Sequence, residues 1–285
     1  MRRHFILSVF RTVIVLGLPL IFLGNTVGNS PPEPKWQQLF NGKDLNDWQV
    51  KIRYHDLNDN YANTFRVQDG NIQVRYDKYS QFDETFGHLF IKKQYSYYLI
   101  AVEYRFIGDQ VKGGPGWAYR NSGIMVHGQD PALMKKDQDF PNSIEVQLLG
   151  GAGNGERPTA NLCTPGTQFV LNGKVVKNHC IESSSKTFNG EQWVRVEVLV
   201  LGDSTIVHYV NGEEVLRYDR PQKDPVGGAE EGELIKGGTI SLQSESHPVD
   251  FRKVEIINLE QYAKDPEKLD AVVKKLMAEK RVAKQ

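Results

Sequence analysis

The chain has 285 residues, of which 39% are hydrophobic and 25% are charged, so it can bury an ordinary core and lacks the composition of a disordered protein. Its 35 Lys and Arg residues balance 35 Asp and Glu residues. Because binding to phosphate groups requires clustered Lys and Arg, this balance argues against a nucleic-acid partner.

The N-terminus has the features of a targeting segment. Three arginines stand within the first eleven residues, and an uncharged apolar stretch follows at 12–24. This stretch is shorter than the about 20 apolar residues of a membrane span, and Thr26 and Gly28 are small enough for a cleavage site. We expect residues 1–28 to be a signal peptide or, as the alternative, a retained membrane anchor. Both interpretations place the rest of the chain in the periplasm, on the outer surface or outside the cell, with membrane contact only through an uncleaved segment.

A proline-rich linker follows at 29–35, and a pattern of short strands then runs from about residue 36 to 259. Asn172-Gly173 and Asn211-Gly212 each lie between two apolar runs. Asn and Gly tolerate the positive φ angles of a two-residue hairpin turn, so both pairs predict tight hairpins.

Strict alternation of apolar and polar residues is clearest at 193–200, where four valines share one face and Arg195 and Glu197 share the other. Segment 143–148 repeats the pattern, with Glu145 and Gln147 on its polar face. No long helical pattern interrupts these segments. Many short strands separated by turns predict an all-β protein built as a two-sheet sandwich.

The C-terminal segment 260–285 is rich in Lys, Glu, Ala and Leu and has a different pattern. Leu269, Val272, Val273 and Leu276 fall at helical spacing. We expect a C-terminal helix that docks on the sandwich through this stripe and ends in a basic tail.

Cys163 and Cys180 are the two cysteines of the chain. In an exported protein an isolated pair favours a disulfide. His179, next to Cys180, offers the alternative of a metal site, although two thiols and one imidazole lack the fourth ligand of a usual zinc site.

Five groups of short segments, in this order, resemble the 3-keto-disaccharide hydrolase family of bacterial sugar-processing proteins. They are 39–45 with Trp48, 121–124, 143–147, 190–193 with 210–212, and 240–245 with 249–252. The resemblance runs from about residue 36 to 259. It implies a jelly-roll sandwich of the concanavalin or laminin-G-like type, with the site on the concave face of one sheet. It also implies an oligosaccharide or glycoside as the partner.

The activity that the resemblance implies is cleavage of 3-keto-glycosides or 3-keto-disaccharides. The ketone acidifies the proton on the neighbouring carbon, C2, and a general base removes it. The group at C1 then departs with help from a general acid, and water adds later. This chemistry needs a carboxylate or His as base, a proton donor, and cationic or amide groups against the developing enolate.

Polar residues of the predicted strands supply the candidates. Glu145 is the candidate base, because Ile144 and Val146 anchor its strand on either side. His127 is the candidate acid or a metal ligand, so a divalent metal is compatible with the sequence although no cofactor is specified. Alternation along 121–127 predicts that Asn121 and His127 share a face, with the small Gly123 between them leaving room for a ligand. The candidates for substrate binding are Asn121, Gln147 and Gln243 for sugar hydroxyls, Arg252 or Arg120 for the enolate oxygen, and Trp117 for stacking on a ring.

Each candidate also has a structural interpretation. Glu145 on a strand is commonly a solvated or ion-paired residue, His127 could cap a strand, and Arg252 could pair with Glu255 or Asp250. Glu145 and Glu245 would form a glycosidase-like carboxyl pair only if the fold brought them together.

Two other classes of function stay open. The first is a carbohydrate-binding module with the same sandwich and no turnover, and the second is a structural or adhesion domain. No P-loop, HExxH, GxSxG or dinucleotide fingerprint is present to support other enzyme classes.

Overall fold

A computed structural model describes residues 33–282 of the chain. The predicted targeting segment 1–28 and the first part of the linker lie outside the described residues. Within 33–282, no helix is both long enough and apolar enough to cross a membrane.

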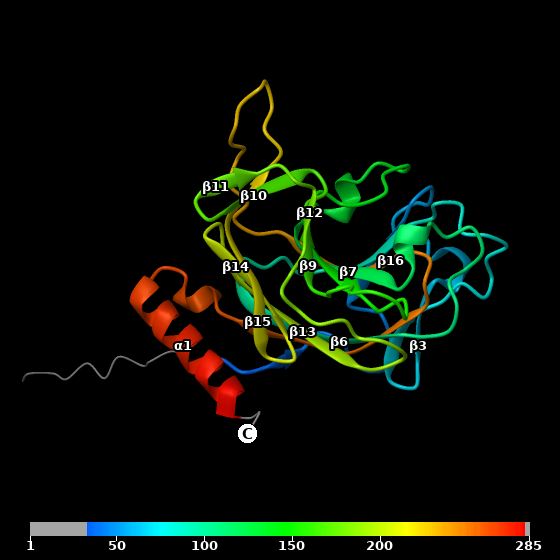
Figure 1. The fold of residues 1–285 in the computed structure, drawn as a ribbon, viewed down its shortest axis with the longest axis horizontal. Coiled ribbons are helices and arrows are strands. Elements are labelled where there is room, and N and C mark those ends of the chain that lie inside the picture. Colours follow the sequence, from blue (N-terminus) through cyan, green and yellow to red (C-terminus); the bar gives the residue numbers. More distant parts are fainter. Residues whose placement is uncertain (1–32, 283–285) are drawn as a thin grey trace, which may run out of the picture. The chain divides into compact units, whose positions relative to one another are not determined.

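Two antiparallel sheets form the body of the protein (Figure 1). The ten-stranded sheet has the order β11-β10-β15-β14-β13-β6-β17-β4-β3, with β1 paired to β17. Its strands are β1 (Gln37–Gln38), β3 (Phe65–Gln68), β4 (Asn71–Val74), β6 (Tyr97–Phe106), β10 (Thr167–Leu171), β11 (Lys174–Val176), β13 (Val194–Leu201), β14 (Thr205–Val210), β15 (Glu213–Lys223) and β17 (Val249–Asn258).

The seven-stranded sheet has the order β12-β9-β8-β7-β16-β5-β2. Its strands are β2 (Trp48–Ile52), β5 (Gly87–Ile91), β7 (Asn121–Gly128), β8 (Ile144–Leu149), β9 (Asn161–Cys163), β12 (Cys180–Ile181) and β16 (Thr239–Ser244). Short 3-10 turns lie at Tyr61–Asn63, Gly116–Ala118, Pro131–Leu133 and Glu260–Tyr262. The chain order crosses repeatedly between the sheets, as in a jelly roll, and the predicted fold class is confirmed.

One hydrophobic core fills the space between the two sheets. On β13 the alternating valines, from Val194 to Val200, all belong to this core, while Arg195 and Glu197 point to the other face and pair with each other. Both predicted Asn-Gly hairpins are present, and at Asn172 and Asn211 φ is positive, as a two-residue turn requires.

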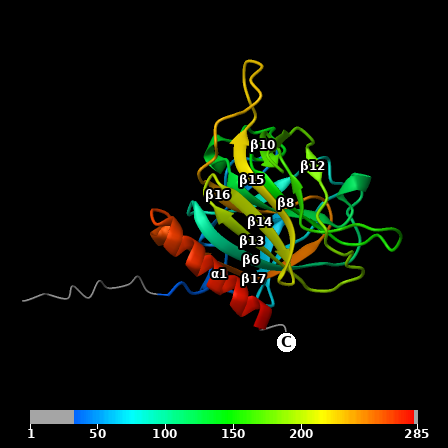
Figure 2. The same cartoon turned by 60° about the vertical axis from the view of Figure 1, so that its left-hand side comes forward.

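Helix α1 (Pro266–Val282) packs on the outer face of the ten-stranded sheet (Figure 2). Leu269, Val272, Val273 and Leu276 contact a second apolar cluster there, which includes Leu99, Leu199 and Ile257. The helix therefore covers part of the ten-stranded sheet, on the opposite side of the sandwich from the outer face of the seven-stranded sheet.

Cys163 and Cys180 form a disulfide, as predicted. The two residues lie directly opposite each other on β9 and β12, at the edge of the seven-stranded sheet. Both thiols of the alternative metal set are used in this bond, and the carbonyl of His179 accepts hydrogen bonds from Thr164.

Candidate functional site

The outer face of the seven-stranded sheet carries most of the predicted site residues. On β8, Ile144, Val146 and Leu148 belong to the core, so Glu145 and Gln147 point away from it. Strand register aligns one row of side chains on this outer face from β2 to β9. The row is Lys51, His88, Gln243, Gly123, Gln147 and Asn161.

Gly123 on β7 forms a gap in this row. A Cβ atom placed on Gly123 would lie 2.9 Å from Gln243 Oε1 and 3.0 Å from both Cγ and Oε1 of Glu145. The carboxyl group of Glu145 and the amide of Gln243 therefore converge above a backbone segment without a side chain. Such a gap lets a ligand approach the strand closely between two polar groups.

Two carboxyl groups are buried in this part of the sheet, and that of Glu145 borders the gap. Glu145 is 6% exposed, and Glu245, which follows β16, is 2% exposed. Burial raises the pKa of Glu145 to about 8, because the charged form loses its hydration. Burial, with a further contribution from the charge of Glu145, raises the pKa of Glu245 well above its ordinary value. Strands β8 and β16 do not pair with each other; both pair with β7, and the two side chains interact across it.

Arg157 supplies a cation close to Glu245. Its guanidinium donates to the carbonyls of Gly150 at 2.6 Å, Arg120 at 3.2 Å and Trp117 at 3.3 Å. Its charge favours the ionised form of Glu245, although the effect of burial is larger. Because three backbone carbonyls fix the guanidinium, its position does not depend on an ion pair.

Several buried polar atoms of the outer face have no hydrogen-bond partner among residues 33–282. They are both ring nitrogens of His88, both side-chain amide atoms of Gln243, Asn121 Oδ1, Ser241 Oγ and Glu245 Oε2. Buried polar atoms are nearly always bonded in folded proteins, and leaving one unpaired costs about 1–3 kcal/mol. A set of them on one sheet face indicates a surface built to meet the polar groups of a ligand or ordered water.

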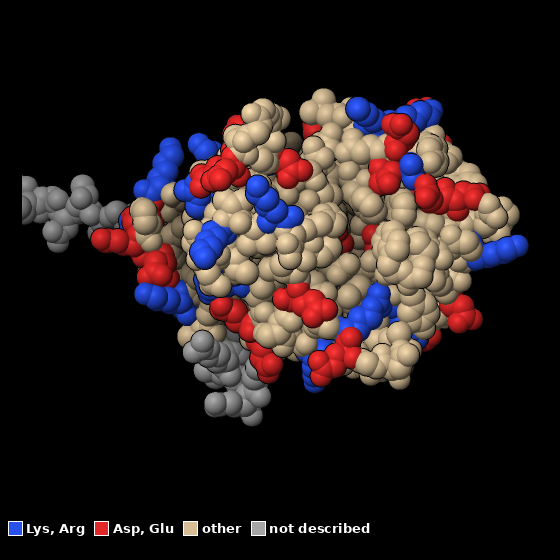
Figure 3. Space-filling view, turned by 45° about the horizontal axis from the view of Figure 1, so that its top comes forward, with Lys and Arg blue, Asp and Glu red and all other residues tan. Residues whose placement is uncertain are grey.

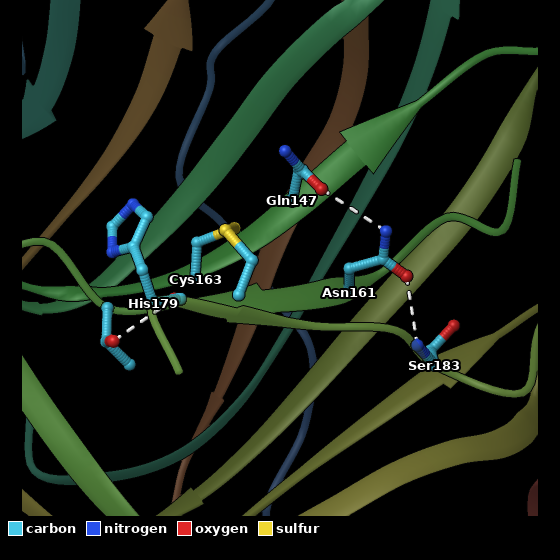
Figure 4. Close-up of a disulfide and its surroundings, with 7 residues drawn as sticks. Gln147, Asn161, Cys163, His179 and Ser183 are labelled. Carbon is cyan, nitrogen blue, oxygen red and sulfur yellow. Dashed lines mark hydrogen bonds between the residues drawn. A yellow bond between two sulfur atoms is a disulfide. The ribbon is translucent and has the colours of Figure 1, made fainter. Parts of the chain in front are cut away.

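Gln147 has a fixed orientation on this face (Figure 4). Asn161 Nδ2 donates to Gln147 Oε1 at 3.2 Å, and the backbone N–H of Ser183 donates to Asn161 Oδ1 at 2.9 Å. This relay occupies the oxygen of the Gln147 amide and determines which way its NH₂ group points.

A chain of aromatic ring contacts connects His88, in the row of outer-face side chains, with the exposed ring of Trp117. The ring of Phe140 meets His88 edge-on and also contacts Phe86, on which Trp117 stacks with ring centroids 5.9 Å apart. Trp117 is 56% exposed, so it retains a free surface for a ligand. Figure 3 shows the molecular surface hollowed on this side, with acidic side chains recessed in the hollow.

The prediction that His127 lies on this face with Asn121 is wrong. The pairing of β7 with β16 shifts register between Ser241 and Thr239, and at His127 φ is +52°. This β-bulge breaks the alternation, so that His127 Nε2 donates to the carbonyl of Gly202, in the β13–β14 turn, at 2.9 Å. Burial lowers the pKa of His127 to about 4, and the ring serves as a structural link between the sheets.

The two arginines predicted to face an enolate are directed elsewhere. Arg252 lies on β17, in the other sheet, where it pairs with Glu103 at 2.7 Å and lies 4.0 Å from the Trp193 ring centroid. Arg120 lies at the end of the seven-stranded sheet, and its guanidinium donates to the carbonyls of Gly151 and Gly190.

Sequence reasoning missed Arg157 and His88. Arg157 follows a glycine-rich loop without any strand pattern, so no periodicity could place it. His88 lies in the strand 87–91, in which all five residues are buried. The strand therefore lacks the alternation of buried and exposed residues that would have indicated an imidazole on the outer face. Burial lowers the pKa of His88 to about 3, so the ring is neutral at physiological pH.

No group of three His, Cys, Asp or Glu side chains among the described residues lies close enough to hold a metal ion. The side chains that the fold brings together at the candidate site are two carboxyls, an imidazole, a guanidinium and three amides.

A two-sheet jelly roll hosts both enzymes and binding domains, so the fold alone does not assign a class, and the family match identifies a carbohydrate-active or carbohydrate-binding domain. The chain belongs to the 3-keto-alpha-glucoside-1,2-lyase-like domain family, whose profile matches residues 35–257. This confirms the resemblance drawn from the sequence. No curated protein matches the chain.

Solved structures with related folds include candidate glycosyl hydrolases and carbohydrate-binding proteins. A candidate glycosyl hydrolase from Parabacteroides distasonis is 20% identical with a TM-score of 0.46, over 79% of this chain and 94% of the other. A carbohydrate-binding module from Bacillus subtilis is 10% identical with a TM-score of 0.45, over 74% and 96%. A β-glucanase from Bacillus licheniformis is 11% identical with a TM-score of 0.43, over 80% and 99%. These likenesses are too low to indicate a substrate.

Proposed function

We propose that this protein cleaves 3-keto-glycosides or 3-keto-disaccharides by removing the proton next to the ketone, with Glu145 as the base. The observation that carries the proposal is that the buried carboxyl of Glu145 and the unpaired amide of Gln243 converge above Gly123, while the buried carboxyl of Glu245 interacts electrostatically with Glu145. A buried carboxyl with a raised pKa is a stronger base than an exposed one, which suits abstraction of a weakly acidic carbon-bound proton.

In the proposed reaction, the Glu145 carboxylate takes the C2 proton and the electron pair moves onto the ketone oxygen as an enolate. The enolate then collapses, the C1–O bond breaks, and a double bond forms between C1 and C2. Addition of water across this bond completes a net hydrolysis.

Glu245 is the proposed proton donor to the departing oxygen. Its pKa is raised by burial and by the charge of Glu145, so it retains a proton when Glu145 is ionised. Two carboxyls of which one is protonated provide a base and an acid in one site. Arg157, next to Glu245, is placed to favour negative charge that develops nearby.

The amides are the proposed contacts to sugar hydroxyls. Gln243 offers a donor and an acceptor, Gln147 offers its NH₂ group, and Asn121 offers Oδ1. The exposed Trp117 ring is the proposed stacking surface at the rim. We further propose that the protein acts after export, in the periplasm or outside the cell.

The test uses purified protein with a 3-keto-glucoside and, separately, with the unoxidised parent glucoside. The proposal expects turnover of the 3-keto compound alone, and a loss of about 10²-fold or more in kcat for Glu145→Gln with substrate binding retained. Binding of either sugar without turnover would replace the proposal with a carbohydrate-binding module. Turnover of the unoxidised parent would indicate an ordinary glycosidase.

A further inference from the structure

The disulfide lies in the same transverse row of side chains as Glu145. Cys163 is directly opposite Glu145 on the neighbouring strand, and Cys180 is directly opposite Cys163. Met125 is opposite Glu145 on the other side. Because Val146 and Leu162 face the core, the sulfur atoms of this row lie on the outer face with the Glu145 carboxyl.

The chain that follows Cys180 also holds Gln147. The backbone N–H of Ser183 donates to Asn161, which donates to Gln147 (Figure 4). Ser183 Oγ also donates to the carbonyl of Thr159 at 2.6 Å. Two residues of the proposed site thus depend on this edge of the sheet: Glu145 through its neighbour Cys163, and Gln147 through the hydrogen-bond relay.

The disulfide joins the two outermost strands of this edge. Strand β12 has two residues and pairs only with β9. Between the cysteines the chain leaves the sheet, forms β10 and β11 in the ten-stranded sheet, and returns. Closing a loop of this size costs entropy, and the covalent link offsets that cost together with the hydrogen bonds that Thr164, Ser183 and Ser185 make beside β12.

We infer that the Cys163–Cys180 disulfide is a positioning element of the site, which keeps the Glu145 carboxyl away from water and the Gln147 amide in its orientation. This inference rests on the proposed function. Release of β12 would hydrate Glu145, lower its pKa and free Gln147 to rotate. The site is then fully active only when the disulfide is formed, as it is in an oxidising, exported environment.

The test is the double variant Cys163→Ala with Cys180→Ala, assayed well below its unfolding temperature. We expect the acidic limb of the kcat/KM profile to move down by roughly one pH unit, because hydration favours the carboxylate. We also expect kcat/KM at the optimum to fall roughly tenfold or more, because the base and the amide lose their alignment.

Two control variants separate positioning from simple stability. Asn161→Ala keeps the disulfide but breaks the relay, so it should raise KM without moving the acidic limb. Leu269→Ala destabilises the protein at the helix on the other sheet and should leave the profile unchanged. A folded double variant with the wild-type pH profile and wild-type kcat/KM would overturn the inference and leave the disulfide with a stabilising role only.

Two further measurements apply if the double variant does not fold or the protein has no turnover. In the first case, folded wild-type protein is treated with tris(2-carboxyethyl)phosphine. The phosphine reduces the disulfide to two thiols and becomes its oxide, and the same profile shift is expected. In the second case, the proposed function fails, but carboxyl-labelled NMR still reports the pKa of Glu145 with and without the disulfide. An unchanged pKa would overturn the inference.

Discussion

Replacing Glu145 by Gln should stabilise the protein at alkaline pH while it removes the proposed base. In the folded state the pKa of Glu145 is raised from 4.5 to about 8, so the folded protein holds a proton that the unfolded chain has lost. The contribution of Glu145 to stability therefore falls as pH rises between these values and is constant above them. Each pH unit in this window lowers the free energy of unfolding by about 1.4 kcal/mol at most. Local hydration of the ionised carboxylate makes the total decrease smaller than this maximum. We therefore expect the free energy of unfolding to fall by about 2–4 kcal/mol between pH 5 and pH 8.

The assay is urea unfolding of wild type and Glu145→Gln at pH 5, 6, 7, 8 and 9. The Gln side chain cannot ionise, so the variant should lack the part of the loss that is due to Glu145, while the part due to Glu245 remains, and the variant should be the more stable protein at pH 8. Glu156→Gln is the matched control, because Glu156 is exposed and should behave as wild type. Parallel pH profiles for wild type and Glu145→Gln would refute the account of a buried carboxyl with a raised pKa.

Three other substitutions test the site and its limits. Gly123→Ala places a methyl group within 3.0 Å of Glu145 and Gln243 and should weaken substrate binding at least about tenfold in a titration, with the fold retained; unchanged affinity would show that the ligand lies elsewhere. Trp117→Ala should raise KM by about two- to tenfold with kcat unchanged, since only stacking at the rim is lost; a kcat effect alone would contradict this role. Arg252→Ala should leave kcat/KM unchanged and lower the free energy of unfolding by roughly 1 kcal/mol through its lost contacts with Glu103 and Trp193; a large loss of turnover would return Arg252 to the site.

The sandwich could be predicted because its strands alternate strictly. The valines of β13 and the Ile144–Glu145–Val146 alternation of β8 specify which side chains face the core, whatever the order of strands in the sheet. The same alternation placed Glu145 and Gln147 on one face, opposite the core. It failed at His127, because a one-residue bulge reverses the direction of a side chain and leaves no sign in the sequence.

The assembly of the site could not be predicted, because it depends on strand order. Glu145 and Glu245 are far apart in the sequence and approach each other only because β8 and β16 both pair with β7. Arg157 is held near Glu245 by hydrogen bonds to backbone carbonyls of two separate loops, and no sequence pattern predicts such bonds. The positions of these side chains depend on pairing between strands that are distant in the sequence. Their roles can therefore be assigned only when the fold is known.

The central claim is that Glu145 removes the proton from the carbon next to the ketone. It is tested most directly with a 3-keto-glucoside that carries deuterium at C2, by following the label by NMR during turnover. We expect wild-type protein to release the deuterium to water and to show a primary isotope effect on kcat/KM, and folded Glu145→Gln to leave the label in place. Cleavage that retains the deuterium at C2, or release at the wild-type rate in Glu145→Gln, would contradict the claim.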